Sequence, residues 1–90
     1  MPVEVSFSSS FQRAFKRLSK TNPRTDSLFK QKLEVFISDP FSAQLKTHKL
    51  SGQLKDLWSF SITYEIRVIF YFIDSTHVLF EDIGTHEDVY

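Results

Sequence analysis

Residues 58–83, WSFSITYEIRVIFYFIDSTHVLFEDI, decide the fold of this 90-residue chain. Apolar and hydroxyl side chains alternate over residues 58–63, which is the two-residue period of a strand with one buried face. Residues 66–73 are nearly all apolar, as in a central strand, and residues 77–83 have the pattern of a third strand. Turn-forming residues at 64–65 and 74–76 separate the three segments. The stretch therefore predicts a three-stranded antiparallel meander.

The residues before the meander predict a strand and two helices. Alternation over residues 3–7 indicates a short strand, and the serines at 8–10 can cap a helix that follows it. That helix has an apolar stripe at Phe11, Ala14, Phe15 and Leu18. We expect a second helix to begin at Asn22-Pro23, with its own stripe at Phe29, Leu33, Phe36 and Ile37, and to end at Asp39-Pro40.

These segments predict one α+β domain over residues 1–90. Its order is an N-terminal strand, a two-helix hairpin and an antiparallel three-stranded meander, with the helices packed on one face of the sheet. Residues 41–56 are polar and show no period, so we expect a loop there. The other face of the sheet is expected to stay partly open.

Composition excludes several classes of protein. The chain is 41% hydrophobic and contains ten phenylalanines, which indicates a folded globule. It has no cysteine, and no histidine pair has zinc-ligand spacing, so we expect no disulfide, no metal and no cofactor. No segment is long and apolar enough to span a bilayer, and the N-terminus lacks a signal-peptide pattern. We expect a cytoplasmic protein with no membrane partner.

Charge is balanced overall but unevenly distributed. The formal net charge is zero, which disfavours a non-specific nucleic-acid binder. Residues 13–32 nevertheless carry seven Lys and Arg against Asp26, and residues 56–88 carry seven acids against Arg67. The basic segment fits either solvated helix faces or a surface that meets phosphate.

Arg67 is the only charge in the predicted central strand. If Val68, Phe70 and Phe72 face the helices, Arg67 points to the opposite, exposed face, because side chains alternate along a strand. A strand arginine is costly without a partner. It therefore either pairs with Glu65 or Glu81 or awaits an anion.

Polar residues near both ends of the meander could join Arg67 on that face. The segment before the meander offers His48 with Lys46, Lys49 and Lys55, and the C-terminal stretch offers His86 and Tyr90. Imidazoles, cations and a phenol together suit phosphate chemistry, since they can transfer protons, stabilise charge and stack on bases.

Four motifs tie these residues together: HKLSGQLK at 48–55, WSFSI at 58–62, YEIRVIFY at 64–71 and IGTHEDVY at 83–90. Together with the predicted order of elements, they resemble the RelE/ParE superfamily of toxin–antitoxin toxins. They are most similar to the RelE-type mRNA interferases of the YafQ-like branch, over essentially the whole chain.

The resemblance implies a toxin of a type II toxin–antitoxin system that cleaves mRNA on the ribosome without a metal. The ribose 2′-hydroxyl would attack the adjacent phosphate and leave a 2′,3′-cyclic phosphate. His86 and His48 match the positions of proton-transfer groups, and Arg67 matches the arginine that stabilises the phosphorane. Glu65 would act as a base or orient a histidine, and Tyr90 would hold or stack the substrate. The lysines expected to guide backbone phosphate are Lys46, Lys49 and Lys55.

The resemblance also implies partners and leaves alternatives. The partners would be a cognate antitoxin and mRNA on the ribosome, with operator DNA contacted only through the antitoxin.

At Ser61 the sequence departs from the YafQ-like branch, which carries a further histidine there, and serine cannot replace imidazole as an acid–base group near neutral pH. A ParE-like gyrase inhibitor, or an inactive regulatory homologue that acts through antitoxin and operator DNA binding, therefore remains an alternative.

Overall fold

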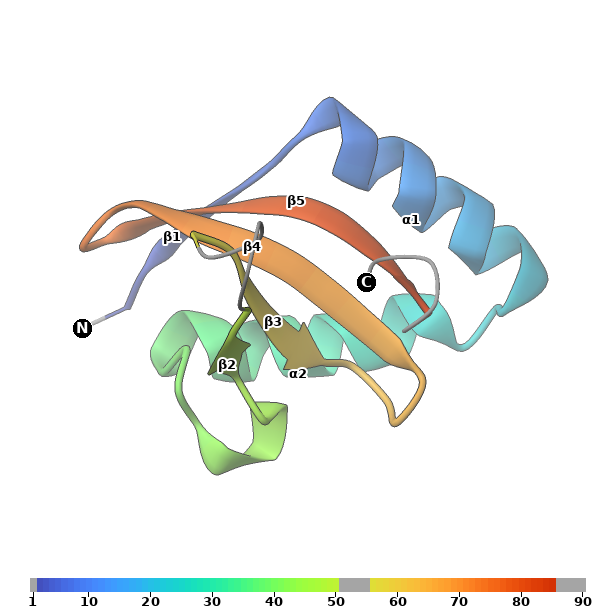
Figure 1. Cartoon of the computed structure of the whole chain (residues 1–90). Helices are drawn as coiled ribbons and strands as arrows, with labels where there is room; N and C mark the ends of the chain where they lie inside the picture. Colours follow the sequence, from blue (N-terminus) through green and yellow to red (C-terminus); the bar gives the residue numbers. More distant parts are fainter. Residues whose placement is uncertain (1, 51–55, 86–90) are drawn as a thin grey trace.

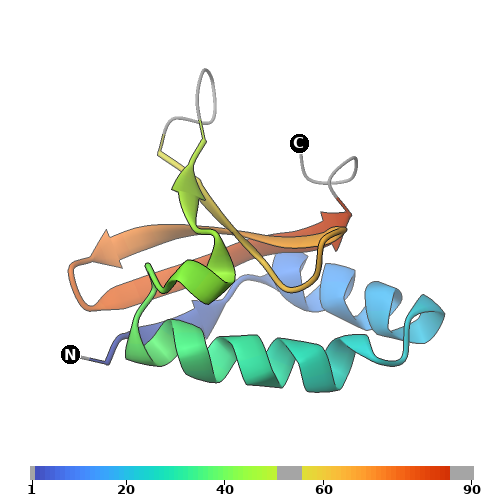
Figure 2. The same cartoon turned by 90° about the horizontal axis from the view of Figure 1, so that it is seen from below.

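The structure is a computed structural model that describes residues 2–50 and 56–85. In chain order its elements are β1 (Glu4–Phe7), α1 (Ser9–Thr21), α2 (Thr25–Ser38), the 3-10 helix η1 (Ala43–Leu45), β2 (His48–Lys49), β3 (Trp58–Ser61), β4 (Ile66–Asp74) and β5 (His77–Thr85). The strands form one sheet in the order β1-β5-β4-β3-β2. Both α-helices lie on the same side of this sheet (Figures 1 and 2). The predicted α+β fold is confirmed.

The N-terminal strand enters the sheet beside its last strand. β1 pairs with β5 in parallel, with Val5 opposite Val78, and all other pairs in the sheet are antiparallel. Ser8 fixes the junction between β1 and α1, because its hydroxyl accepts a hydrogen bond from the Phe11 amide and donates one to the Glu81 carbonyl, each at 2.9 Å. The first helix is thereby capped and attached to β5 at one point.

The core is built from phenylalanines that the helices and strands contribute together. Phe36 of α2 is fully buried, and its ring centroid lies 4.9 Å from those of Phe60 and Phe70 and 5.1 Å from that of Phe80. These three partners come from β3, β4 and β5 respectively. The predicted apolar stripes of both helices also face this core: Phe11, Ala14 and Phe29 are buried in it. One side chain of α2 therefore holds three strands against the helical layer.

Two details of the chain path differ from the prediction. α2 begins at Thr25 rather than at Asn22-Pro23, because the Asn22 amide donates to the Leu18 carbonyl and so ends α1. The segment 41–56, expected to be a loop, contains η1 and the two-residue edge strand β2. An element of two or three residues is too short to show a period in the sequence.

The face of the sheet opposite the helices is more covered than expected. Ser59, which lies between His48 and Ile69 in the register, is fully buried, and Ser61, opposite Arg67, is 7% exposed. Arg67, predicted to be exposed, is half-buried. No helix in residues 2–50 and 56–85 is long and apolar enough to cross a membrane.

Candidate functional site

Arg67 lies in the middle of the sheet and has no acidic partner among the described residues. It stands opposite Ser61 of β3 and Gly84 of β5, and its Nη1 donates a hydrogen bond to the Ser61 hydroxyl. Its Nε atom is buried and has no hydrogen-bond partner within residues 2–50 and 56–85. Of the two predicted outcomes for Arg67, pairing with Glu65 or Glu81 is therefore wrong for the described part of the chain. The guanidinium retains donors that an anionic oxygen could accept from.

A pocket of about 240 Å³ brings Arg67 together with two lysines. It forms where α2, η1, the end of β3 and the turn before β4 meet, and none of the described residues that line it is a carboxylate. The lining residues are Lys32, Gln44, Lys46, Ser61, Ile62, Thr63, Tyr64 and Arg67. Three cations around one small space create a positive potential there, although the whole chain is neutral.

The segment between η1 and β2 orients both Lys46 and His48. Lys46 is the one non-glycine residue of the described chain with a positive φ, 53°, in the left-handed conformation that ends η1. Its carbonyl oxygen lies 3.2 Å from Nδ1 of His48. A carbonyl can only accept, so this contact places the proton of a neutral His48 on Nδ1 and the lone pair on Nε2. The turn thus orients the His48 imidazole through the backbone carbonyl of Lys46.

Strand register separates His48 from Lys49. His48 lies opposite Ser59 and therefore shares the face of the sheet that carries Ser61 and Arg67. Two strand spacings and two residues separate its Cα from that of Arg67, roughly 12 Å. Lys49 lies opposite Trp58 on the other face, with its Nζ 5.9 Å from the centre of the Trp58 ring. Of the lysines predicted to guide RNA, Lys46 lies beside Arg67 and Lys49 does not.

Of the remaining predicted site residues, Glu65 does not line this pocket, and the other three are not among the described residues. Glu65 is exposed in the turn between β3 and β4, where its amide donates to the Thr63 hydroxyl at 3.3 Å. Lys55, His86 and Tyr90 lie outside the described residues. Gly84, which faces Arg67 in the register, precedes His86 by two positions in the sequence.

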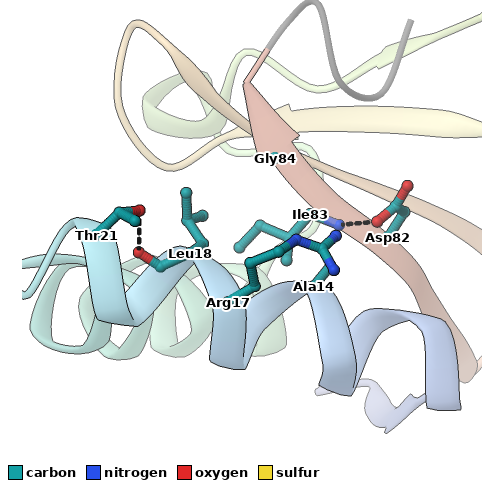
Figure 3. Close-up of a pocket in the computed structure, with 7 residues that line it drawn as sticks. All are labelled: Ala14, Arg17, Leu18, Thr21, Asp82, Ile83 and Gly84. Atoms are coloured by element: carbon teal, nitrogen blue, oxygen red, sulfur yellow. Dashed lines mark hydrogen bonds between the residues drawn. The ribbon is translucent and has the colours of Figure 1, made fainter.

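A second pocket, between α1 and the end of β5, differs in charge. Its lining consists of Ala14, Arg17, Leu18, Thr21, Asp82, Ile83 and Gly84. Figure 3 shows Arg17 and Asp82 on the two sides of this space. One carboxylate oxygen of Asp82 accepts a hydrogen bond from the Ile83 amide at 2.9 Å. The acid offsets the arginine, so this pocket suits a phosphate less well than the one at Arg67.

The sequence did not single out several residues of the Arg67 pocket, among them Lys32, Gln44 and Tyr64. Lys32 is one of seven basic residues in residues 13–32, and nothing in the sequence distinguishes it from the other six, which are exposed in the structure. Gln44 lies in the segment expected to be a loop, and Tyr64 was assigned only to a turn. No group of three or more potential metal ligands occurs among residues 2–50 and 56–85.

This arrangement of two α-helices packed against a five-stranded sheet is the fold of RelE-like toxins. It matches a YafQ histidine-to-glutamine mutant from Escherichia coli with a TM-score of 0.82 at 19% identity, covering 98% of each chain. YafQ in the E. coli DinJ-YafQ toxin–antitoxin complex matches with a TM-score of 0.78 at 17% identity, covering 100% of this chain and 99% of that one. A YoeB/ParE toxin from Agrobacterium tumefaciens also gives 0.78, at 19% identity, covering 93% of this chain and 99% of that one.

The sequence itself identifies the family. The family described as "Bacterial toxin of type II toxin-antitoxin system, YafQ" matches residues 3–90. The chain therefore belongs to the YafQ family of type II toxin–antitoxin toxins. A search among curated proteins found no significant match.

Proposed function

We propose that this toxin is a ribosome-dependent mRNA endoribonuclease that inhibits translation. One observation carries the proposal: Arg67, held by Ser61 and without an acidic partner in the described chain, lines a pocket with Lys32 and Lys46, and no carboxylate occurs among the described residues of that lining. Such a pocket suits a phosphodiester whose negative charge grows in the transition state. Membership of the YafQ family supports the same activity.

The proposed reaction needs only proton transfer and charge stabilisation. The ribose 2′-oxygen forms a bond to the adjacent phosphorus as the bond from phosphorus to the 5′-oxygen breaks. His48, which the family resemblance matches to a proton-transfer position, receives the proton of the 2′-hydroxyl. His86 donates a proton to the departing 5′-oxygen. The products are a 2′,3′-cyclic phosphate and a 5′-hydroxyl.

The other predicted residues act around this centre. Arg67 stabilises the pentavalent phosphorane. The planar guanidinium suits this role because it carries several N–H donors. Glu65, exposed in the turn before β4, orients a histidine or serves as an additional base. Tyr90 stacks on the substrate, and Lys46 guides its backbone, together with Lys55 and Lys49. Because the guanidinium supplies the positive charge, the reaction requires no metal.

The partners follow from the family. E. coli YafQ forms a complex with DinJ, and we expect this chain to bind a cognate antitoxin in the same way. The substrate is mRNA on the ribosome, so the toxin acts in the cytoplasm. Operator DNA is contacted only through the antitoxin.

The proposal is tested by expressing the chain from a tight promoter, measuring growth and mapping mRNA 5′ ends in the cells. Translated messages should be cleaved by the wild type, and cleavage should disappear in Arg67→Ala and His86→Ala. Arg17→Ala is the matched control, because it removes an arginine from the other pocket. Intact messages with gyrase-linked DNA breaks would contradict the proposal and support the ParE-like alternative. Absence of toxicity would support a regulatory homologue instead.

A further inference from the structure

The Arg67 pocket contains more recognition chemistry than cleavage requires. The proposed reaction uses Arg67 and the two histidines, whereas Lys32, Gln44 and Tyr64 line the same pocket and have no part in proton transfer or in stabilising the phosphorane. They come from α2, η1 and the turn between β3 and β4. Three separate elements therefore place a cation, an amide and an aromatic ring beside the proposed catalytic arginine.

Tyr64 is unusual in its exposure. Its side chain is 87% exposed, the highest value among the large hydrophobic residues that the structure leaves open to solvent. The turn that carries it is well fixed at its base, since the Thr63 hydroxyl accepts hydrogen bonds from the amides of Glu65 and Ile66, at 3.3 and 3.1 Å. An exposed ring on a fixed turn does not stabilise the core, but it presents a flat face on which a nucleic-acid base can stack.

Lys32 and Lys46 supply the charge beside this ring. Lys32 is half-buried on α2 and lines the pocket, unlike the exposed Lys30 two residues earlier. Lys46 is held by its left-handed backbone conformation, which costs a non-glycine residue about 1 kcal/mol and is often retained at functional positions. Gln44 adds an amide that can donate to or accept from a base edge.

We propose that Lys32, Lys46, Gln44 and Tyr64 form a nucleotide subsite for the single-stranded mRNA residue next to the cleaved bond. The lysines bind the backbone phosphate of that nucleotide, Tyr64 stacks on its base, and Gln44 contacts the base edge. This inference rests on the proposed function in taking RNA as the ligand, but it concerns binding and not cleavage. The subsite fixes the position of the strand so that the scissile phosphate reaches Arg67.

The test uses a short single-stranded RNA in which every ribose is 2′-O-methylated, because a blocked 2′-oxygen prevents cleavage. Binding to the purified chain is followed by NMR titration, which detects weak affinity. Signals of Tyr64, Gln44 and Lys32 should shift in the wild type. Lys32→Gln should weaken binding by roughly fivefold and reduce its salt dependence, because one phosphate contact is lost. Lys30→Gln, the matched control on the same helix, should bind as the wild type does.

A coupled substitution in protein and RNA tests the stacking. Bases are removed from the RNA one position at a time. At one position, removal should weaken binding to the wild type roughly tenfold. The same removal should have no effect on binding to Tyr64→Ala but should still weaken binding to Tyr64→Phe. The proposal is overturned if the wild type shows no shifts at these residues, or if Lys32→Gln and Lys30→Gln behave alike. It is also overturned if, at every RNA position, the losses of binding free energy caused by base removal and by Tyr64→Ala simply add. A wild type that binds this RNA yet leaves translated mRNA intact refutes the proposed function and leaves the subsite standing.

Discussion

Arg67 and Ser61 are direct cross-strand partners, and the arginine donates a hydrogen bond to the serine hydroxyl. By the family resemblance, Ser61 matches the position at which the YafQ-like branch carries a further histidine. In this chain that position therefore holds the proposed phosphate-binding group in place instead of exchanging a proton. Under the proposed function, proton transfer is assigned to His48 and His86.

Replacing Ser61 tests this division of labour. Ser61→Ala should slow mRNA cleavage about tenfold, because a charged donor loses an acceptor and the guanidinium is less well oriented. The pH dependence of cleavage should keep its shape, since no proton-transfer group is removed. Cleavage rates measured across pH check both statements. In an Arg67→Ala background, Ser61→Ala should cause no further loss; an additional loss there would show that Ser61 acts independently of Arg67.

Replacing Lys46 separates the effect of its backbone conformation on stability from the effect of its charge on RNA cleavage. At φ 53° a glycine avoids the steric cost that a side chain pays, so Lys46→Gly should be about 1 kcal/mol more stable than Lys46→Ala. Both variants should cleave less RNA than the wild type, because both lose the cation. Chemical denaturation gives the free energy of unfolding for each variant. Equal stabilities would mean that the backbone at this position relaxes on substitution.

The aromatic core predicts a large contrast between two phenylalanines. Phe36 is fully buried against three strands, so Phe36→Ala should lower the free energy of unfolding by about 3–5 kcal/mol. Phe41 is 54% exposed, and Phe41→Ala should cost less than about 1 kcal/mol. Denaturant unfolding monitored by Trp58 fluorescence measures both. A small effect of Phe36→Ala would contradict the central position of this ring.

Asp74 predicts a pH-dependent contribution to stability. Hydrogen bonds from the Thr76 amide and then its hydroxyl lower the pKa of the Asp74 carboxyl, with His77 adding to the effect. A lowered pKa in the folded state stabilises the protein above the unfolded pKa, and this stabilisation is lost as pH falls through the folded value. Asp74→Ala should therefore reduce the melting temperature at pH 7 and reduce it less below about pH 4. Equal reductions at both pH values would assign the effect to side-chain packing.

The sequence alone determined most of the architecture of this protein. The two-residue period of residues 58–63 and the apolar run 66–73 specified the strands. The apolar stripes that include Phe11, Phe29 and Phe36 specified the helices, because periodic burial leaves a periodic pattern. It also directed attention to Arg67, whose charge interrupts an apolar strand. The beginning of α2 and the strand β2 could not be predicted, since each depends on a few hydrogen bonds rather than on a period.

Only the tertiary structure decided which polar residues share a site. Lys46 and Lys49 look equivalent in the sequence, yet the register of β2 places Lys49 over Trp58, while Lys46 lines the Arg67 pocket. Lys32 joins that pocket from a helix that is distant in the sequence. The physical reason is that hydrophobic periodicity records which face of an element is buried, whereas the meeting of side chains depends on strand pairing and helix packing across the whole chain.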